Sequence, residues 1–460
     1  MSETVSPDDL ARFAAVEAAL DARWPESKIE PSLTRIAELV DLLGAPQQTY
    51  PVIHIAGTNG KTSTSRMIDA LLTSFGLRVG RYTSPHLESL RERISLQGEP
   101  ISVERFLDTY DDVAAYLDYV DSKNEVKLSY FEVLTAMAFT AFADAPVDVA
   151  VVECGLGGEW DATNVADGLV AVITPIDIDH VEYLGSSIAG IAATKAKIIK
   201  EDSRAILARQ PLEAAEELIR QVAVVDATPF REGLEFALVK RELAIGGQLI
   251  SIQGLAGEYS DIFLPLYGAH QAHNAAVAVA AVEAFLGGGS QMLDIDALRE
   301  GFAQVTSPGR LETLRRNPTI MIDAAHNPHG ARALADALDE GFDFDYLVGV
   351  VAVLGEKDAH GLLAALEPVL SEVIVTKSTS PRALPIDELE KIAVDVFGED
   401  RVFVARDLAE AIELGVTRAE ENDNLGGSGV VITGSVVTAG QARHLLGGTR
   451  LSGPDLSDSE

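Results

Sequence analysis

The stretch Tyr50–Ser65, YPVIHIAGTNGKTSTS, contains the residue types with the clearest chemistry. A short apolar run, Val52–Ala56, predicts a buried strand, and a helical pattern extends over Thr62–Phe75. Between them, Gly-Thr-Asn-Gly-Lys-Thr would gather backbone N–H groups and a helix N-terminus around one point, which suits a phosphate chain. Lys61 would reach the β- and γ-phosphates, and the Thr62 hydroxyl would approach Mg²⁺. The stretch therefore indicates use of a nucleoside triphosphate.

The pattern is a shortened form of the general phosphate-binding loop. That loop carries a glycine five residues before Gly60, where this chain has Ile55, so only the G-x-x-G-K-T portion is present. A structural glycine-rich turn with a solvated lysine is the alternative interpretation. The succession of strand, loop and helix favours phosphate binding.

Composition limits the class of protein. The chain has 460 residues, 47% hydrophobic and 23% charged, which is typical of a globular protein with two domains. We expect a cytoplasmic protein without a membrane partner, because no apolar run reaches about 18 residues and the acidic N-terminus lacks the features of a secretory signal. The single cysteine, Cys154, excludes an internal disulfide and is expected to be a buried core thiol.

The charge balance is strongly acidic. There are 71 acidic and 36 basic residues, a net charge of −35, which argues against a nucleic-acid partner. Because ATP is also an anion, binding it requires local positive charge. Lys61 and Mg²⁺ could supply that charge, since distant carboxylates are screened beyond about 8 Å at physiological salt.

Strand-like and helical patterns alternate along most of the chain, which predicts an α/β class with mainly parallel sheets. We expect an N-terminal nucleotide-binding domain at 1–306, with a small antiparallel appendix within 235–267. A linker at 307–318 would lead to a second open α/β domain at 319–450, without a phosphate loop of its own. The polar tail 451–460 is expected to be disordered.

Polar residues follow several predicted strands. Glu153 ends the run VDVAVVE, and His180 lies in DIDH, after the next predicted strand. Ligands of open α/β sheets bind beyond the carboxyl ends of the strands, where a carboxylate and an imidazole could hold Mg²⁺ or phosphate. A surface glutamate and an ordinary hydrogen-bonded histidine are the alternatives. Ser84, after the second strand, could offer its hydroxyl to a metal or belong to a plain polar turn.

A similar cluster occurs in the second predicted domain. Asp323, His326 and Asn327 follow a strand and precede a helix with Pro328 at its first position. They could face a cleft, or Asp323 or Asn327 could merely cap the helix. Arg310 lies in the predicted linker, where it could clamp an anion or be solvated.

Taken together, these residues resemble the folylpolyglutamate synthase family, in particular the bacterial bifunctional dihydrofolate synthase/folylpolyglutamate synthases, which are Mur-ligase-like, ATP-dependent amide-forming enzymes. The resemblance extends from about Thr34 to His444. Its motifs, in order, are YPVIHIAGTNGKTST, YTSPHLESLRERI, VVECGLGGEWDATN, DHVEYLG, TKAKIIK, HQAHN, SPGRLE, DAAHNP, SPRAL and TGSVVTAG.

The resemblance implies a role for each matched position. ATP would be bound by Gly57, Thr58, Asn59, Gly60, Lys61, Thr62, Ser63, Asn274, Arg310, Asp323 and His326. Two Mg²⁺ ions would be held by Thr62, Ser84, Glu153 and His180. Folate or glutamate would contact Ser84, Pro85, His86, Asp161, Thr163, Asn164, Ser380 and Arg382. Catalysis would involve Lys61, His180 and Lys195, the last as the family's carbamylated lysine (N6-carboxylysine).

Three positions depart from the family pattern, with Glu159 in place of arginine, Thr194 of glutamate and Lys197 of glycine. Two of them flank Lys195. Carbamylation needs a neutral amine and hence a lowered pKa. We expect the cation at Lys197 and the loss of a carboxylate at Thr194 both to favour a neutral Lys195.

The resemblance implies that a carboxylate of dihydropteroate, or of the terminal glutamate of a folate, attacks the γ-phosphate of ATP to give an acyl phosphate and ADP. Free L-glutamate would then attack the acyl phosphate, forming an amide and releasing phosphate. A Mur-type peptidoglycan ligase with another acceptor is the nearest alternative. A nucleotide-binding regulatory module without ligase activity is the second. The family also implies a monomer.

Overall fold

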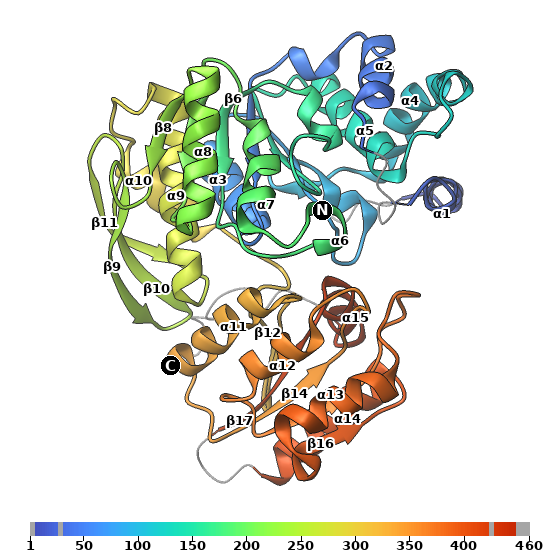
Figure 1. Cartoon of the computed structure of the whole chain (residues 1–460), viewed down its shortest axis with the longest axis vertical. Coiled ribbons are helices and arrows are strands. Elements are labelled where there is room, and N and C mark those ends of the chain that lie inside the picture. The colour runs from blue at the N-terminus through green and yellow to red at the C-terminus, as the bar shows by residue number, and fades with distance from the viewer. Residues whose placement is uncertain (1–4, 26–30, 423–426, 448–460) are drawn as a thin grey trace. The chain divides into compact units, whose positions relative to one another are not determined.

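The computed structural model describes residues 5–25, 31–422 and 427–447. The chain divides into two compact units (Figure 1), the first formed by 1–265 with 270–306 and the second by 266–269 with 307–460. The tail expected to be disordered, 451–460, lies outside the described residues. No helix in the described ranges is both long and apolar enough to cross a membrane.

The first unit is built, over its described residues, on an eight-stranded sheet in the order β4-β3-β2-β5-β1-β6-β7-β8. The strands are β1 (Val52–Ala56), β2 (Val79–Tyr82), β3 (Ile94–Leu96), β4 (Glu99–Pro100), β5 (Val149–Glu153), β6 (Gly168–Ile173), β7 (Arg204–Leu207) and β8 (Thr228–Arg231). From β2 to β8 along this order, neighbouring strands are parallel, whereas β3 and β4 add an antiparallel edge. The central strand β1 is buried along its whole length, as its apolar sequence predicts.

Helices cover this sheet or pack on other helices of the first unit (Figure 1). They are α1 (Pro7–Asp21), α2 (Thr34–Leu42), α3 (Lys61–Ser74), α4 (Val103–Lys123), α5 (Tyr130–Asp144), α6 (Val181–Leu184), α7 (Ile188–Lys195), α8 (Leu212–Val225), α9 (Ala269–Gly287) and α10 (Ile295–Ala303), with the 3₁₀ turns η1 (Pro46–Gln48), η2 (Leu90–Arg93), η3 (Ala162–Val165) and η4 (Ala196–Ile198). Helix α3 packs on β2 and β5, and α7 and α8 share a core with β6 and β7. Cys154, which follows β5, is buried as expected, and burial raises its pKa well above the usual value.

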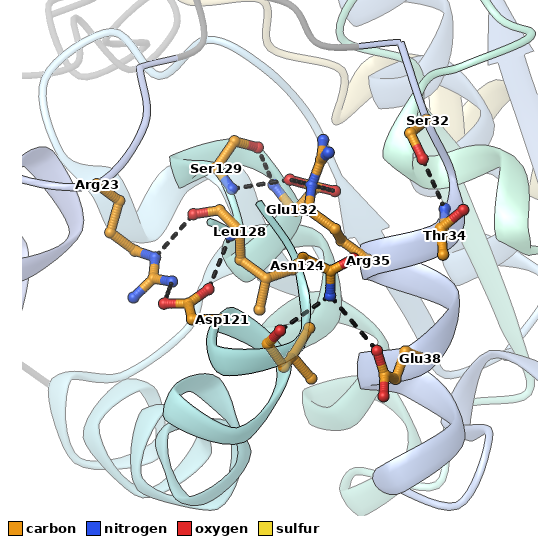
Figure 2. Close-up of polar contacts among 11 residues, drawn as sticks. Arg23, Ser32, Thr34, Arg35, Glu38, Asp121, Asn124, Leu128, Ser129 and Glu132 are labelled. Atoms are coloured by element: carbon orange, nitrogen blue, oxygen red, sulfur yellow. Dashed lines mark hydrogen bonds and ion pairs between the residues drawn. The ribbon is translucent and has the colours of Figure 1, made fainter. Parts of the chain in front are cut away.

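Ion pairs connect α2 and the segment after α1 to α4 and α5 (Figure 2). Arg35 of α2 donates from Nε to Glu132 Oε1 at 3.1 Å, and both side chains are buried. Glu132 also accepts from the Ser129 backbone at 2.8 Å, while the Ser129 hydroxyl accepts from the Glu132 N–H, which forms the capping box of α5. Arg23, just after α1, pairs with Asp121 of α4 at 2.6 Å. These contacts join segments 97 and 98 residues apart in the chain.

A small antiparallel sheet follows β8. Its strands are β9 (Ala237–Ala244), β10 (Gly247–Gln253) and β11 (Glu258–Leu264). The turn between β9 and β10 contains Gly246 at φ +81°, and the antiparallel pairing of these strands agrees with the antiparallel appendix predicted within 235–267. Glu283 of α9 is fully buried and accepts a hydrogen bond from the Tyr259 hydroxyl at 2.8 Å, which ties this sheet to α9.

The second unit carries, among the residues that the structure describes, a six-stranded sheet in the order β12-β13-β17-β14-β15-β16. Its strands are β12 (Glu312–Arg316), β13 (Thr319–Ile322), β14 (Tyr346–Val351), β15 (Glu372–Val375), β16 (Val402–Val404) and β17 (Ser428–Thr433). Its helices are α11 (Pro328–Gly341), α12 (Ala359–Leu366), α13 (Ile386–Phe397), α14 (Leu408–Glu421) and α15 (Val436–Leu445), with the turn η5 (Glu399–Arg401).

The second sheet is parallel except at one edge, where β12 pairs antiparallel with β13. Strand β12 lies inside the segment expected to be a linker. The predicted class is confirmed: mainly parallel α/β sheets, a small antiparallel appendix and a second open α/β domain. The sequence patterns do not reveal the short strands β3, β4, β8 and β12.

Candidate functional site

Three strand ends meet near the middle of the first sheet. β1 lies between β5 and β6, with Ile55 opposite Glu153 and Ala56 opposite Ile173 in the parallel register. The loops that follow all three strands therefore start side by side. In the sheet, β5 and β2 lie on one side of β1, and β6 lies on the other, so the strand order changes direction at β1. Open α/β sheets bind ligands at such a switch point.

Two glycines shape the loop between β1 and α3. At Gly57 (φ +148°) a Cβ atom would lie 1.9 Å from Thr174 Oγ1, and at Gly60 (φ +87°) one would lie 2.6 Å from Asn274 Oδ1. Neither position can carry a side chain without displacing its neighbour. The loop is thus packed against the end of β6 and against α9.

The amides of this loop divide into two groups. The N–H groups of Thr58 and Asn59 donate to the Pro175 carbonyl at 3.0 and 3.3 Å, so they hold the loop to the segment after β6. The amides of Lys61 and Thr62 belong to the first turn of α3, where N–H groups have no intrahelical acceptor. This corrects the expectation that the whole loop aims its amides at one point, since the helix turn is the part aligned for an anion.

Two lysines share one carbonyl oxygen beside the loop. Lys61 Nζ lies 3.2 Å from the Gly57 oxygen and 3.2 Å from the Thr58 oxygen, and Lys195 Nζ donates to the same Gly57 oxygen at 2.7 Å. Burial, reinforced by the charge of Lys61, lowers the pKa of Lys195 from 10.5 to about 7. The Lys195 amine is therefore partly neutral near pH 7.

The expected influence of Lys197 on Lys195 is wrong. The Lys197 ammonium donates to Gln221 Oε1 at 3.0 Å on an exposed face, and Lys61 is the cation that helps to lower the Lys195 pKa. Residues two apart on a helical turn project to different sides. Helix α7 ends at Lys195 and the 3₁₀ turn η4 follows it directly, so the Lys197 side chain is directed away from the site.

Thr62 and Glu153 form the contact best suited to a metal. The Thr62 hydroxyl donates to Glu153 Oε1 at 2.9 Å, and Glu153 is only 1% exposed. Carboxylate and hydroxyl oxygens are donors that Mg²⁺ prefers, so this pair fits the expected ion. His180, at the start of the short α6, is 42% exposed and lies beside Asp179. Within the described ranges, no group of three or more His, Cys, Asp or Glu residues is arranged to hold a metal.

Ser84, Pro85 and His86 lie in the segment between β2 and η2. Ser84 and His86 are half-buried, and Pro85 is exposed after a cis peptide bond. Arg66, one helical turn after Thr62 on α3, interacts electrostatically with Glu92 of η2 and with the carboxylate that ends β5. The segment and the end of β5 are therefore close enough to share one cation.

Arg66 is a further candidate for the site, which the glycine-loop motif alone does not reveal. It is half-buried, and burial together with repulsion from Arg81 lowers its pKa to about 9. On a helix, residues four apart share one face. The four-residue spacing between Thr62 and Arg66 is therefore the sequence signal that could have indicated Arg66.

The residues of the DATN motif are buried inside the loop after β5. Asp161 accepts from the Leu156 N–H at 2.8 Å and from the Thr163 hydroxyl at 2.5 Å, and Thr163 Oγ1 lies 2.8 Å from His54 Nε2. Asn164 is also buried. Burial lowers the pKa of His54 to about 3, so its ring is neutral. These side chains shape the loop, and their contact with a substrate stays a prediction.

Side-chain hydrogen bonds connect Asn274, through Gln271, to Ser63 in the first turn of α3. Asn274 Nδ2 donates to Gln271 Oε1 at 3.2 Å, and Gln271 Nε2 donates to the Ser63 hydroxyl at 3.3 Å. All three side chains are buried. The structure therefore brings Asn274 and Ser63 together, as predicted residues of one site, with Gln271 as an unpredicted bridge within the HQAHN motif.

The remaining predicted residues lie in the second unit. Asp323 accepts hydrogen bonds from the N–H groups of Leu311 and Ala325 at 2.8 Å each. Burial raises the pKa of Asp323, although the nearby Arg310 acts in the opposite direction. His326 Nδ1 lies 3.0 Å from the Ala324 oxygen. The three predicted residues Arg310, Asp323 and His326 thus gather around the end of β13.

Asn327, rather than Asp323, caps α11. Its side chain accepts from the Gly330 N–H at 2.8 Å, and Pro328 is the first residue of the helix. Ser380 and Arg382 lie in the segment after β15, where the Ser380 hydroxyl accepts from the Arg382 N–H at 3.2 Å and the guanidinium forms an exposed ion pair with Glu356.

Comparison with known protein families matches two parts of the chain. Residues 55–282 match the family described as Mur ligase middle domain, and residues 309–436 match the family described as Mur ligase, glutamate ligase domain. Each match falls almost wholly within one of the two units.

Comparison with individual proteins gives longer matches. The chain is 54% identical to a dihydrofolate synthase/folylpolyglutamate synthase of Mycobacterium tuberculosis, over 96% of this chain and 95% of that protein. A structure of Mycobacterium tuberculosis folylpolyglutamate synthase complexed with ADP is 55% identical, with a TM-score of 0.92 over 95% of this chain and 99% of that one. A complex of folylpolyglutamate synthase with AMPPCP and folate is 29% identical, with a TM-score of 0.83 over 94% and 99% of the two chains.

Proposed function

We propose that this chain, which belongs to the dihydrofolate synthase/folylpolyglutamate synthase family, is an ATP-dependent ligase that joins L-glutamate to dihydropteroate and to the γ-carboxylate of folate glutamates. The name of the Mycobacterium tuberculosis relative supports the reaction. The ADP in one similar structure and the AMPPCP and folate in another support the two kinds of substrate.

The observation that carries the proposal is the arrangement at the end of β1. Lys61, the first turn of α3 and the Thr62–Glu153 contact surround one point beyond the strand ends. A lysine, helix-terminal amides and hard oxygen ligands are what a triphosphate with its metal requires.

In the proposed reaction, Lys61 moves from the Gly57 and Thr58 carbonyls to the β- and γ-phosphates, and the first-turn amides of α3 hold phosphate oxygens. The substrate carboxylate attacks the γ-phosphorus, the bond to ADP breaks, and an acyl phosphate forms. The amine of L-glutamate then attacks the acyl carbon, and phosphate leaves. Mg²⁺, when bound, would neutralise charge on the phosphate oxygens.

Thr62 and Glu153 are the residues that would hold a first Mg²⁺, with Ser84 as a further ligand. His180 would join Glu153 at a second ion, as the family resemblance implies. Oxygen and imidazole donors are compatible with this assignment.

Lys195 is proposed to be carbamylated. The neutral amine nitrogen adds to CO₂ and releases a proton, which gives a carbamate with a negative charge. A pKa of about 7 supplies the neutral amine at physiological pH. Bicarbonate enriched in ¹³C should give a carbamate signal in the wild type that is absent in Lys195→Met, and equal spectra of the two proteins would reject the modification.

The reaction is tested by measuring ADP release with dihydropteroate and with a tetrahydrofolate, each with and without L-glutamate. We expect sustained release only when an acceptor and glutamate are both present. A UDP-muramoyl substrate serves as the control acceptor. Release driven by that substrate alone would favour a peptidoglycan ligase, and nucleotide binding without release under any condition would favour a regulatory module.

A further inference from the structure

Helix α9 consists mostly of alanine and valine and carries few buried polar side chains. Its sequence is AHQAHNAAVAVAAVEAFLG, and its buried polar residues are Gln271, Asn274 and Glu283. Glu283, near the far end of the helix, is bonded to the small antiparallel sheet. A buried amide costs free energy unless it is hydrogen-bonded, so Gln271 and Asn274 need polar partners at the start of the helix.

Gln271 connects α9 to the start of α3. Its Oε1 atom accepts from Asn274 Nδ2 at 3.2 Å, and its Nε2 atom donates to the Ser63 hydroxyl at 3.3 Å. Asn274 in turn lies against Gly60, where a Cβ atom would be 2.6 Å from Asn274 Oδ1. Gln271 therefore reaches Ser63 directly and Gly60 through Asn274.

These two contacts enclose the first turn of α3. Gly60 is the N-cap residue at φ +87°, and its carbonyl accepts from the Thr64 N–H at 2.9 Å. The amides of Lys61 and Thr62, which are aligned for an anion, lie between Gly60 and Ser63. Donors that are already in place when an anion arrives avoid the cost of being ordered by it. The contacts with α9 are suited to keep these donors in place.

The other contacts of this turn are made by groups that the proposed reaction uses. Lys61 donates to carbonyls of its own loop, and the Thr62 hydroxyl donates to Glu153. Lys61 is proposed to move to the phosphates, and Thr62 and Glu153 are the proposed Mg²⁺ ligands. Gln271 belongs to neither set, which leaves it free to serve the shape of the turn alone.

We propose that Gln271 is a positioning residue, which holds Gly60 and the first turn of α3 in the shape that accepts nucleotide phosphates before the nucleotide binds. It acts through Ser63 and Asn274 and does not itself contact the ligand. The identity of the ligand rests on the proposed function, whereas the order of this turn in the free protein does not depend on catalysis.

The order of the turn is tested by amide hydrogen exchange of the whole free protein. Gln271→Met keeps a side chain of similar length and removes both hydrogen bonds, so we expect the amides of 60–65 to exchange several-fold faster. Gln248→Met is the matched control, because Gln248 is a fully buried glutamine of the same unit that accepts from Arg241 in the small sheet. Its amides at 60–65 should exchange as in the wild type.

Two exchange results would overturn the proposal. One is unchanged exchange at 60–65 in Gln271→Met. The other is an increase spread evenly over the first unit, which would mean a general loss of stability and no specific role in this turn.

Nucleotide binding is tested by titrating the same proteins with ADP and Mg²⁺ in a calorimeter. We expect the Kd for ADP to rise about fivefold in Gln271→Met, the scale of one hydrogen bond, and to stay unchanged in Gln248→Met. The KM for ATP should rise likewise, with kcat at saturating ATP nearly unchanged. A lower kcat with an unchanged KM would contradict the positioning role. If the wild type bound no ADP, the proposed function would fail while the exchange result still stood.

A double-mutant cycle tests whether Gln271 acts through Ser63. The loss of ADP affinity in the combined Gln271→Met and Ser63→Ala protein should be smaller than the product of the two single losses. A full product would show that the two residues act independently and would overturn the proposal. Ser63→Ala also covers the case in which Gln271→Met does not fold, because it should by itself speed exchange at 60–65. Wild-type exchange in Ser63→Ala would then reject the bridge.

Discussion

The Gly57 carbonyl oxygen accepts from Lys61 and Lys195, and so holds two potential like charges beside one acceptor. Their proximity helps to explain why Lys195 titrates near neutrality, after burial as the main cause. A side chain at position 57 would collide with Thr174. One backbone group thereby links the phosphate loop to the lysine proposed to be modified.

Lys61→Ala is expected to lower turnover by about 10³-fold, because the loss removes a preorganised cation from the transferred phosphoryl group. The fold should persist, since Lys61 is half-buried and contacts carbonyls of its own loop. Turnover and circular dichroism of the variant check both statements. Lys197→Ala, which removes an exposed lysine, is the control. A fully active Lys61→Ala protein would refute the phosphate role.

Glu153→Gln is expected to raise the Mg²⁺ concentration needed for half-maximal activity by at least about tenfold, since a neutral amide is a weaker ligand for a hard cation. A Mg²⁺ titration of turnover at saturating ATP measures the effect. Glu159→Gln provides the comparison, because it neutralises a half-buried carboxylate in the loop after the same strand. Superimposable titrations of wild type and Glu153→Gln would remove Glu153 from the metal site.

At the scale of elements, the start of α5 depends on a buried ion pair with α2. Arg35→Met would leave the Glu132 carboxylate buried beside its capping partner without the guanidinium (Figure 2). We expect this to lower the free energy of unfolding by about 3 kcal/mol. Lys123→Met, which removes a more exposed pair with Glu38, should cost much less, because solvent screens that pair. Urea unfolding measures both, and equal losses would show that burial of the pair contributes little.

The elements around the site could be predicted closely from sequence. The run Val52–Ala56 matches β1 residue for residue, and α3 begins and ends one residue before the predicted Thr62–Phe75. Both carry strong local signals: a buried apolar run and a helical period. Strand β12, Glu312–Arg316, carries none, because its sequence ETLRR is polar and its pairing with β13 depends on tertiary contacts.

The site residues show the same division. Lys61 and Glu153 could be found from local signals, because Lys61 begins the helix after the glycine loop and Glu153 is the last residue of β5. Arg66 carries only the weaker signal of its four-residue spacing from Thr62 on α3. Gln271 could not be found, because its relation to Ser63 appears only after segments 208 residues apart pack together. The Lys197 expectation failed for a related reason, since sequence proximity to Lys195 does not fix the direction of a side chain.

On the scale of the whole molecule, the chain is strongly acidic, but cationic side chains lie beside the phosphate loop together with the carboxylate of Glu153. The net charge is −35, yet Lys61, Arg66 and Lys195 lie on segments beside the strand ends of the first unit. Positive charge at that place can balance an anionic substrate locally, because the remaining carboxylates are screened by solvent and salt. Lys195 contributes positive charge only when its amine is protonated. Because its pKa differs between the folded and unfolded chain, the stability of the first unit depends on pH.

The direction of this linkage follows from the Lys195 pKa, about 7 when folded against a model value of 10.5. Between these values the unfolded chain binds the proton and the folded chain does not, so the contribution of Lys195 to stability rises with pH and is least favourable below about pH 7. From pH 7 to 9, the free energy of unfolding of the wild type should therefore rise relative to Lys195→Met, by at most about 1.4 kcal/mol per pH unit. Urea unfolding in CO₂-free buffer avoids carbamylation, and Lys197→Met supplies a lysine variant that should run parallel to the wild type. If Lys195→Met also ran parallel to the wild type, the buried amine would have an ordinary pKa and the basis for its proposed reaction with CO₂ would be lost.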